Sequence, residues 1–267
     1  MNNKGKTLLI ELTQQCNLNC KYCFYRDYGR AKEEIDLFKL QEIISENEDI
    51  SEIFFTGGEC TIAKAFLQII EEASKKAKVT IFTNGIKLKD ITFLKQIDGF
   101  ISQYIVTYDD YKNEYFCRDN VEFTEKGIQN VLKISPDKLV VKICINKYNI
   151  DNLENIIKHI YQLGVKKISI NMIHNINNSS NNFELEKNDI IKAFDILDEY
   201  KEICHINYYD DVKTFFKQDM NLLNKKCKAG KSFFFYDCYG NKKKCPGDCK
   251  KKNCKVTKEC ISLFEMF

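Results

Sequence analysis

The sequence has no tryptophan, two prolines and three histidines in 267 residues. No apolar run approaches the roughly 18 residues that a membrane-spanning helix requires. The chain starts with MNNKGKTLLIEL, which contains no apolar segment long enough for a signal peptide. We therefore expect a soluble, cytoplasmic protein with no membrane partner, and we draw no function from the scarcity of tryptophan and proline.

Cysteine, by contrast, is abundant, with 13 residues. An odd number of cysteines in a chain without an export signal argues against a disulfide framework, because the cytoplasm keeps thiols reduced. Clustered cysteines in that compartment indicate a metal centre or catalysis.

The net charge of +3 is unevenly distributed along the chain. Between Lys225 and Cys260 there are twelve lysines and three acidic residues, a local charge of +9, so the rest of the chain is acidic. Such a segment is usually a solvated face, although it could attract nucleic acid or an acidic peptide. Its lysines lack the interleaved aromatic residues that stack on bases, so we do not expect a nucleic acid partner.

Hydrophobic periodicity predicts alternating strands and helices over residues 1–205. The expected strands are 7–12, 51–56, 78–83, 101–107, 139–146 and 167–173, and the expected helices are 33–48, 61–77, 90–97, 121–134, 151–163 and 184–202. This alternation is typical of a parallel sheet covered by helices. We expect an α/β fold, a partial (β/α)6 barrel similar to a TIM barrel, followed at 206–267 by a small cysteine-rich β-hairpin module.

The polar and glycine-containing motifs all follow predicted strands. In strand order they are the cysteine loop Cys16–Cys23, Thr56–Glu59, Thr83–Gly85, Thr107–Asp109, Asn146 and Met172. In β/α barrels the active site is built at the carboxyl ends of the strands. We therefore expect these motifs to converge on one site.

The cysteine loop carries three thiols, those of Cys16, Cys20 and Cys23. A zinc knuckle would need a fourth cysteine or histidine at short spacing, and the nearest histidine is His159. Iron–sulfur clusters are usually held by four thiolates. Three thiols in one loop therefore predict a cluster with one iron left open for a substrate or cofactor.

The spacing C-x3-C-x2-C resembles that of radical S-adenosylmethionine (radical SAM) enzymes. The resemblance implies a 4Fe-4S cluster whose open iron is chelated by the amino and carboxylate groups of S-adenosyl-L-methionine (SAM). It also implies reductive cleavage of SAM to a 5′-deoxyadenosyl radical that abstracts a hydrogen atom from the substrate. An electron donor such as flavodoxin or ferredoxin, and anaerobic chemistry, belong to that expectation.

The resemblance extends to a set of residues that would bind the cofactor: Tyr22, Gly57, Gly58, Glu59, Asn84, Thr107, Arg118, Asn146 and Met172. Gly57–Glu59 resembles the GGE motif that binds the methionine part of SAM, and Tyr22 matches the aromatic residue beside the adenine. Arg118 resembles the arginine that holds the SAM carboxylate. Strand-end hydrogen bonding is the alternative role for Thr107 and Asn146, and a surface ion pair is the alternative for Arg118.

The C-terminal segment has the pattern C-x12-G-x4-C, with Cys227, Gly240 and Cys245 at the defined positions. The apolar run 233–236 and the turn at Gly240 predict a β-hairpin. The pattern resembles SPASM and twitch modules, which implies a second, auxiliary 4Fe-4S cluster. Its expected ligands are Cys227, Cys245, Cys249, Cys254 and Cys260, of which not all are needed. A structural zinc site in the same residues is the alternative.

The predicted function is a radical SAM oxidoreductase that modifies a peptide or protein. The resemblance is to maturases of ribosomally made peptides (RiPPs) and to anaerobic sulfatase-maturating enzymes, which implies oxidation, crosslinking or epimerisation. A small-molecule radical SAM dehydrogenase and an RNA-modifying radical SAM enzyme are alternatives. A non-enzymatic electron carrier is a further alternative, but it would not need the motifs at the strand ends.

Two cysteines outside the expected clusters are candidate catalytic residues. If Asn146 faces the barrel interior, strand alternation places Cys144 and Lys142 there as well, with Val141, Ile143 and Ile145 packed against the helices. Cys60 stands where the radical SAM family usually has a proline after GGE. Either thiol could return a hydrogen atom to a substrate radical, and the alternative is that both fill space in the core.

Overall fold

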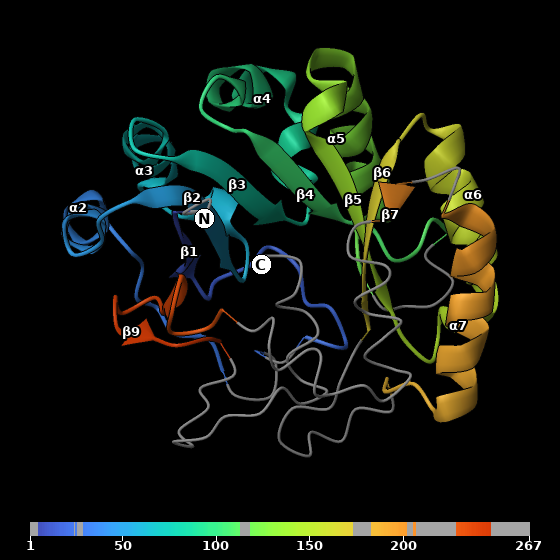
Figure 1. Ribbon diagram of the computed structural model, residues 1–267. Coiled ribbons are helices and arrows are strands. Elements are labelled where there is room, and N and C mark those ends of the chain that lie inside the picture. Colours follow the sequence, from blue (N-terminus) through green and yellow to red (C-terminus); the bar gives the residue numbers. More distant parts are fainter. Residues whose placement is uncertain are drawn as a thin grey trace.

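A computed structural model describes residues 5–23, 25, 29–112, 118–172, 183–201, 205–206 and 228–246. In these segments the chain forms one sheet with helices on one of its faces (Figure 1). The strands are β1 Lys6–Thr13, β2 Ile50–Gly57, β3 Lys78–Thr83, β4 Gln103–Thr107, β5 Leu139–Ile145, β6 Lys167–Met172, β7 His205–Ile206, β8 Phe233–Tyr236 and β9 Lys242–Lys243.

The helices lie between these strands along the chain and form the outer layer of the fold. They are α2 Leu37–Ser45, α3 Phe66–Ser74, α4 Ile91–Asp98, α5 Val121–Ile134, α6 Leu153–Gln162 and α7 Lys187–Tyr200. The α/β alternation predicted from the sequence is confirmed. No helix in the described segments is long and apolar enough to cross a membrane.

The sheet order in the described residues is β7-β6-β5-β4-β3-β2-β1-β8-β9, and every pair except β8–β9 is parallel. The curved sheet from β1 to β6 with helices around its outside is a partial barrel (Figure 1). The helices cover the outer face of these strands and apolar side chains line part of the inner face, so the strands are apolar along most of their length. All seven residues of β5 are buried.

The largest differences in helix start are at α2 and α3, which begin four and five residues later than predicted, for identifiable reasons. Helix α2 begins at Leu37 because Asp36 is its N-cap, accepting a hydrogen bond from the Lys39 amide at 2.8 Å. The residues before it are drawn to the sheet, where Glu34 pairs with Thr13. Helix α3 begins at Phe66 because the chain first makes a 3-10 turn at Cys60–Ile62, capped by the Glu59 carboxylate.

The apolar side chains form two layers, one on each face of the sheet. The outer layer, between strands and helices, includes Val141, Ile143 and Ile145, as strand alternation predicts. The inner layer lies on the opposite face and consists of Leu9, Phe54, Ile105, Val140, Phe233, Phe235 and Cys245. Lys142 and Cys144 lie on the same inner face of β5 as Val140 but closer to the carboxyl end of the strand, beyond this apolar cluster.

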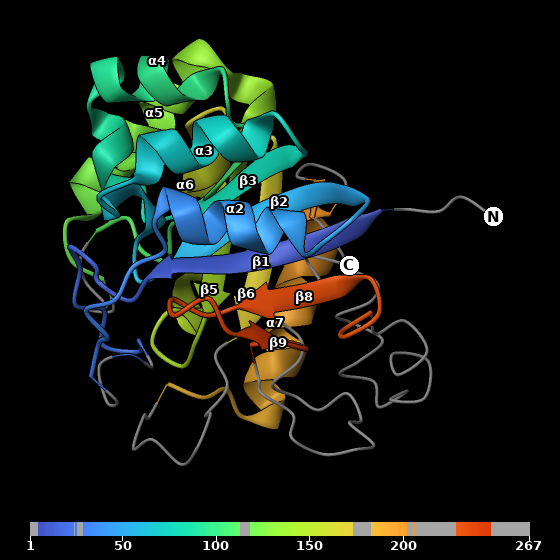
Figure 2. The same ribbon diagram turned by 90° about the vertical axis from the view of Figure 1, so that its left-hand side faces the viewer.

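The predicted C-terminal hairpin is confirmed, with β8 and β9 antiparallel. Strand β8 also pairs with β1, so the hairpin continues the barrel sheet (Figure 2). The Tyr236 hydroxyl accepts a hydrogen bond from the Asn47 side chain at 2.7 Å, which ties the hairpin to the segment after α2. Of the five expected auxiliary ligands, Cys245 is described, and Cys227, Cys249, Cys254 and Cys260 lie outside the described residues.

Candidate functional site

The cysteine loop is held against the turn that follows β2. The Gly58 amide donates to the Thr13 carbonyl at 2.8 Å and the Glu59 amide donates to the Gln15 carbonyl at 2.9 Å. A Cβ atom on Gly57 would lie 2.1 Å from the Thr13 carbonyl oxygen, and one on Gly58 would lie 2.4 Å from the Gln15 carbonyl oxygen. The two glycines are therefore required for the close approach of the loop.

Glu59 joins the ends of β2 and β3. Its Oε1 atom accepts hydrogen bonds from the Thr61 amide at 3.2 Å, the Thr61 hydroxyl at 2.6 Å and the Thr83 hydroxyl at 2.7 Å. Its Oε2 atom accepts from the Asn84 amide at 2.6 Å. The side chain is 1% exposed, so this carboxylate is a buried, fully hydrogen-bonded junction.

Asn84 connects that junction to the cysteine loop. Its side-chain Nδ2 donates to the Asn17 Oδ1 at 2.7 Å and to the Cys16 Sγ at 3.8 Å. The Leu18 amide donates to the same sulfur at 3.3 Å. Cys16 is therefore a thiol with two N–H donors directed at it.

Tyr22 of the loop forms a network with Asp109 and Arg118, both of which are buried. The Tyr22 hydroxyl donates to Asp109 Oδ2, the Arg118 Nη2 donates to that hydroxyl at 3.0 Å, and the Arg118 Nε pairs with Asp109 Oδ2 at 3.3 Å. Burial raises the pKa of the Tyr22 phenol well above its usual value, so the phenol is neutral and available as a donor.

Arg118 Nη1 is buried and has no hydrogen-bond partner in the described part of the chain. Burying a guanidinium N–H without an acceptor is costly. The network therefore presents one donor that a further anionic group could satisfy.

Cys20 lies close to this network. Burial raises the pKa of its thiol to about 11, although the nearby positive charge of Arg118 opposes the effect. Cys144 adjoins the same network, because its amide donates to Asp109 Oδ1 at 2.7 Å. Cys144 is on the inner face of β5, as strand alternation predicts, and is 9% exposed.

The thiols of the loop fit a multinuclear cluster better than a single metal ion. In the described residues, no three His, Cys, Asp or Glu side chains are grouped as one ion would require. A 4Fe-4S cluster distributes its thiolates over different iron atoms, so it accepts ligands that are farther apart than those of one tetrahedral zinc ion. The exposed fractions of Cys16, Cys20 and Cys23 are intermediate, so the loop can receive such a group.

Thr107 and Asn146 occupy the rim at the ends of β4 and β5. Thr107 is half-buried and in register with Lys142. Asn146 is fully buried, and its side chain forms hydrogen bonds with the local backbone. The Nδ2 atom donates to the Cys144 carbonyl at 3.1 Å, and the Oδ1 atom accepts from the Tyr148 backbone amide at 2.9 Å. The described contacts of Asn146 thus include the strand-end bonding that the sequence left as an alternative.

Two residues of the expected site are on the other face of the sheet. Cys60 is fully buried in the outer layer, where its thiol donates to the Phe82 carbonyl at 3.2 Å. The 3-10 turn that starts at Cys60 directs it toward the helices, so the expectation that its thiol faces the chamber is wrong. Met172 also packs in the outer layer, because Ser169 and Asn171 take the inner positions of β6.

Two site residues were missed as ligand candidates in the sequence. Asp109 is completely buried, and its signal was its position two residues beyond Thr107 at the end of an apolar strand. Asn17 contacts Asn84 across the loop, and nothing in its local sequence distinguishes it. Both depend on contacts between residues distant in sequence.

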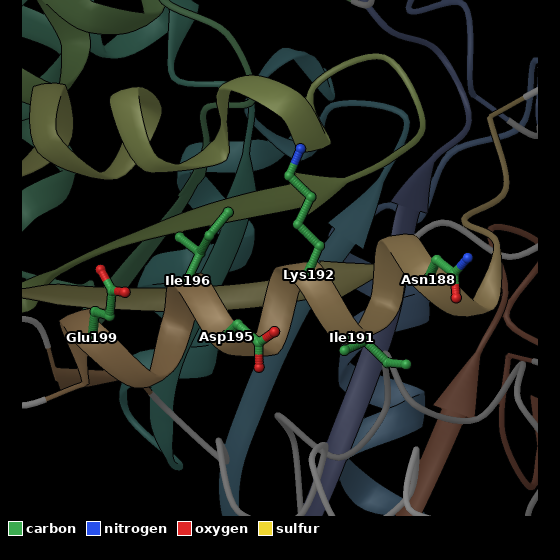
Figure 3. Close-up of a pocket in the computed structure, with 6 residues that line it drawn as sticks. All are labelled: Asn188, Ile191, Lys192, Asp195, Ile196 and Glu199. Carbon is green, nitrogen blue, oxygen red and sulfur yellow. The ribbon is translucent and has the colours of Figure 1, made fainter.

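A hollow of about 400 Å³ on α7 lies apart from this rim. Its described lining comes from that one helix: Asn188, Ile191, Lys192, Asp195, Ile196 and Glu199 (Figure 3). Lys192 pairs with Asp151 at 2.5 Å. None of these residues belongs to the network around the cysteine loop, so the hollow is not the candidate site.

A partial parallel barrel with three thiols on the loop after β1, and a glycine-rich turn packed against that loop, defines a class of metal–sulfur enzymes built on β/α barrels. The family model of the radical SAM superfamily matches residues 10–183. The chain belongs to the radical SAM superfamily.

The chain is similar in sequence to a probable GTP 3′,8-cyclase and similar in fold to two proteins whose structures contain a bound peptide. The chain is 26% identical over 189 residues to the probable GTP 3′,8-cyclase of Sulfurisphaera tokodaii, covering 66% of this chain and 59% of that protein. The structure of anSMEcpe with bound AdoMet and Cp18Cys peptide gives a TM-score of 0.71 at 17% identity, over 98% of this chain and 79% of that one.

Streptococcus suis SuiB bound to precursor peptide SuiA gives a TM-score of 0.73 at 12% identity, over 95% of this chain and 62% of that one. At these identities the two structures show a shared fold. The chain spans about three fifths of the length of the Sulfurisphaera tokodaii relative.

Proposed function

We propose that this protein cleaves SAM reductively and uses the resulting radical to modify a peptide or protein substrate. The observation that carries the first part is the arrangement at the rim, where the three-thiol loop lies between the Glu59–Asn84 junction and the Tyr22–Asp109–Arg118 network. Membership of the radical SAM superfamily supports the same chemistry.

In this proposal Cys16, Cys20 and Cys23 hold the cluster, and Arg118 Nη1 donates to the carboxylate of SAM. A carboxylate there would supply the acceptor that this buried donor lacks. When bound and reduced, the cluster supplies the electron that splits SAM into methionine and the 5′-deoxyadenosyl radical. The packed inner layer of the barrel closes the floor of the chamber and excludes water.

The fold matches support a peptide or protein as the substrate. Those of anSMEcpe and SuiB cover 95% or more of this chain, and both of those structures contain a peptide. Cys144 remains our proposed hydrogen-atom donor if the reaction is an epimerisation.

A small-molecule substrate is the second candidate. It is favoured by sequence similarity, because the Sulfurisphaera tokodaii relative, at 26% identity, is a probable GTP 3′,8-cyclase. That similarity covers 66% of this chain, whereas the fold match with anSMEcpe covers 98%. We therefore place the peptide first.

We also propose a second 4Fe-4S cluster in the C-terminal segment, with Cys245 among its ligands. Cys245 is 4% exposed and packs with Phe233 and Phe235 in the inner layer, beside the hairpin. An apolar surrounding of this kind shields a cluster from solvent, which is one determinant of its reduction potential. The remaining ligands would come from Cys227, Cys249, Cys254 and Cys260.

The test is anaerobic reconstitution with iron and sulfide, followed by dithionite and SAM. We expect 5′-deoxyadenosine from the native protein and none from a Cys16→Ala, Cys20→Ala, Cys23→Ala triple variant, by chromatography and mass spectrometry. The triple variant should keep about four irons per chain in the second cluster. About one zinc per chain instead would assign the C-terminal cysteines to a structural site.

Cys60→Ser is the matched control, because Cys60 is buried in the outer layer and serine can also donate to the Phe82 carbonyl. It should form 5′-deoxyadenosine like the native protein. No product from the reconstituted native protein, or undiminished product from the triple variant, would refute the proposal. Adding short peptides or GTP to this reaction distinguishes the two substrate classes. A true substrate should increase the yield of 5′-deoxyadenosine and should itself change in mass.

A further inference from the structure

Asn84 lies between the end of β3 and the first cysteine of the loop, and it is 7% exposed. We propose that Asn84 is a positioning residue that sets the reduction potential of the cluster through its hydrogen bond to Cys16 Sγ. This inference rests on the proposed function. It differs from the expectation that Asn84 contacts SAM, because it assigns the residue to a cluster ligand.

The orientation of the Asn84 side-chain carboxamide is determined by its hydrogen-bond partners. Its Oδ1 accepts a hydrogen bond from the Ile86 amide at 3.0 Å. A flipped amide would direct its NH2 group at that N–H donor, which no rotation relieves. The Nδ2 atom must therefore face the cysteine loop.

The backbone of Asn84 is held as firmly as its side chain. Its amide donates to Glu59 Oε2 at 2.6 Å, and its carbonyl accepts from the Thr124 hydroxyl at 2.8 Å. A donor fixed by the protein fold in this way does not need to reorganise when the charge of its acceptor changes.

The two hydrogens of Nδ2 have two acceptors. One is Asn17 Oδ1 at 2.7 Å and the other is Cys16 Sγ at 3.8 Å. With the Leu18 amide at 3.3 Å, the sulfur of Cys16 receives two N–H dipoles. Reduction adds negative charge to a cluster and its thiolates, so donors to those sulfurs stabilise the reduced form and raise the potential.

Asn84→Asp tests this directly, because aspartate has the same shape and keeps an oxygen that accepts from the Ile86 amide. Its second oxygen replaces the donor to Cys16 and adds a negative charge. We expect a lower reduction potential of the cluster, measured by redox titration with electron paramagnetic resonance (EPR). The decrease should correspond to at least a tenfold change in the equilibrium constant for reduction. For a one-electron couple this is about 59 mV.

Asn84→Ala removes the donor without adding charge, so it should lower the potential by less than Asn84→Asp does. The matched control is Asn130→Ala, a buried asparagine whose Nδ2 donates to the Leu88 and Lys89 carbonyls away from the cluster. It should leave the potential unchanged. The relevant EPR signal is the one that SAM perturbs and that the triple cysteine variant lacks.

The outcomes separate this inference from the proposed function. If the native protein shows no SAM-sensitive cluster signal, the proposed function fails. If the signal is present and both Asn84 variants titrate at the native potential, the inference is wrong. It is also wrong if the potential stays constant while the affinity for SAM falls in Asn84→Ala, because that result assigns Asn84 to SAM itself.

Discussion

Replacement of Glu59 by glutamine tests whether this residue is a structural junction or only a cofactor contact. One carboxylate oxygen accepts three hydrogen bonds, from the Thr61 amide, the Thr61 hydroxyl and the Thr83 hydroxyl, and the other accepts one from the Asn84 amide. Glutamine preserves the shape of the side chain but converts one of these acceptors into a donor.

Neither orientation of the new amide satisfies all the donors. With its NH2 group at the Oε2 position it faces the Asn84 N–H, and at the Oε1 position it faces the Thr61 N–H. The threonine hydroxyls can rotate to accept, whereas the backbone N–H groups cannot. The change therefore removes one charge-assisted hydrogen bond and leaves a buried donor unpaired, which should cost about 2 to 3 kcal/mol of stability.

The assay is urea unfolding of the cluster-free protein under reducing conditions, where no SAM or iron contributes. We expect a lower midpoint at unchanged slope for Glu59→Gln. The matched control is Glu52→Gln on β2, the strand that precedes Glu59. Glu52 is only partly buried, and its carboxylate accepts a hydrogen bond from the Thr80 hydroxyl at 3.2 Å, a group that can rotate. Burial raises the pKa of the Glu52 carboxyl, which favours its neutral form.

Glu52→Gln should therefore change the free energy of unfolding by about 0.5 kcal/mol or less. If Glu59→Gln is equally mild in the cluster-free protein, the junction contributes nothing to the fold and the reasoning from its four hydrogen bonds is refuted. Glu59 would then be assigned to the cofactor alone, as the GGE resemblance implies.

Gly57→Ala should destabilise the protein by about 2 to 4 kcal/mol, because Gly57 has a φ of 143° and its added Cβ would meet backbone; Gly99→Ala, with open space around it, should stay within about 0.5 kcal/mol of the native protein in the same urea titration. Burial disfavours the ionised form of Asp98, but hydrogen bonds from Ser135 and Lys138 outweigh it and lower the pKa. Asp98→Asn should lower the free energy of unfolding, and the deficit should have its full size above about pH 4, the usual range of aspartate. The deficit should shrink as the pH falls through the lower folded-state pKa of Asp98. A deficit that is constant from pH 7 to about pH 3 would contradict this assignment.

Much of the fold could be predicted from local sequence, because strand and helix periodicity are properties of neighbouring residues. The expected strand 78–83 and helix 121–134 coincide with β3 and α5. The cysteine loop and the GGE turn were also readable, since their chemistry depends on spacing over a few residues. Errors arose where a side chain competed with the local pattern, as when Asp36 and Glu59 delayed the starts of α2 and α3.

Local spacing and periodicity thus specify the α/β alternation, the three-thiol loop and the strand ends to which the motifs belong. Which side chains meet there depends on the tertiary structure. It placed Asp109 between Tyr22 and Arg118, turned Cys60 into the outer layer, and joined β8 to β1 across more than 200 residues. The physical reason is that these contacts are set by strand register and by the direction of tight turns, which bring distant residues together and leave no local periodicity in the sequence.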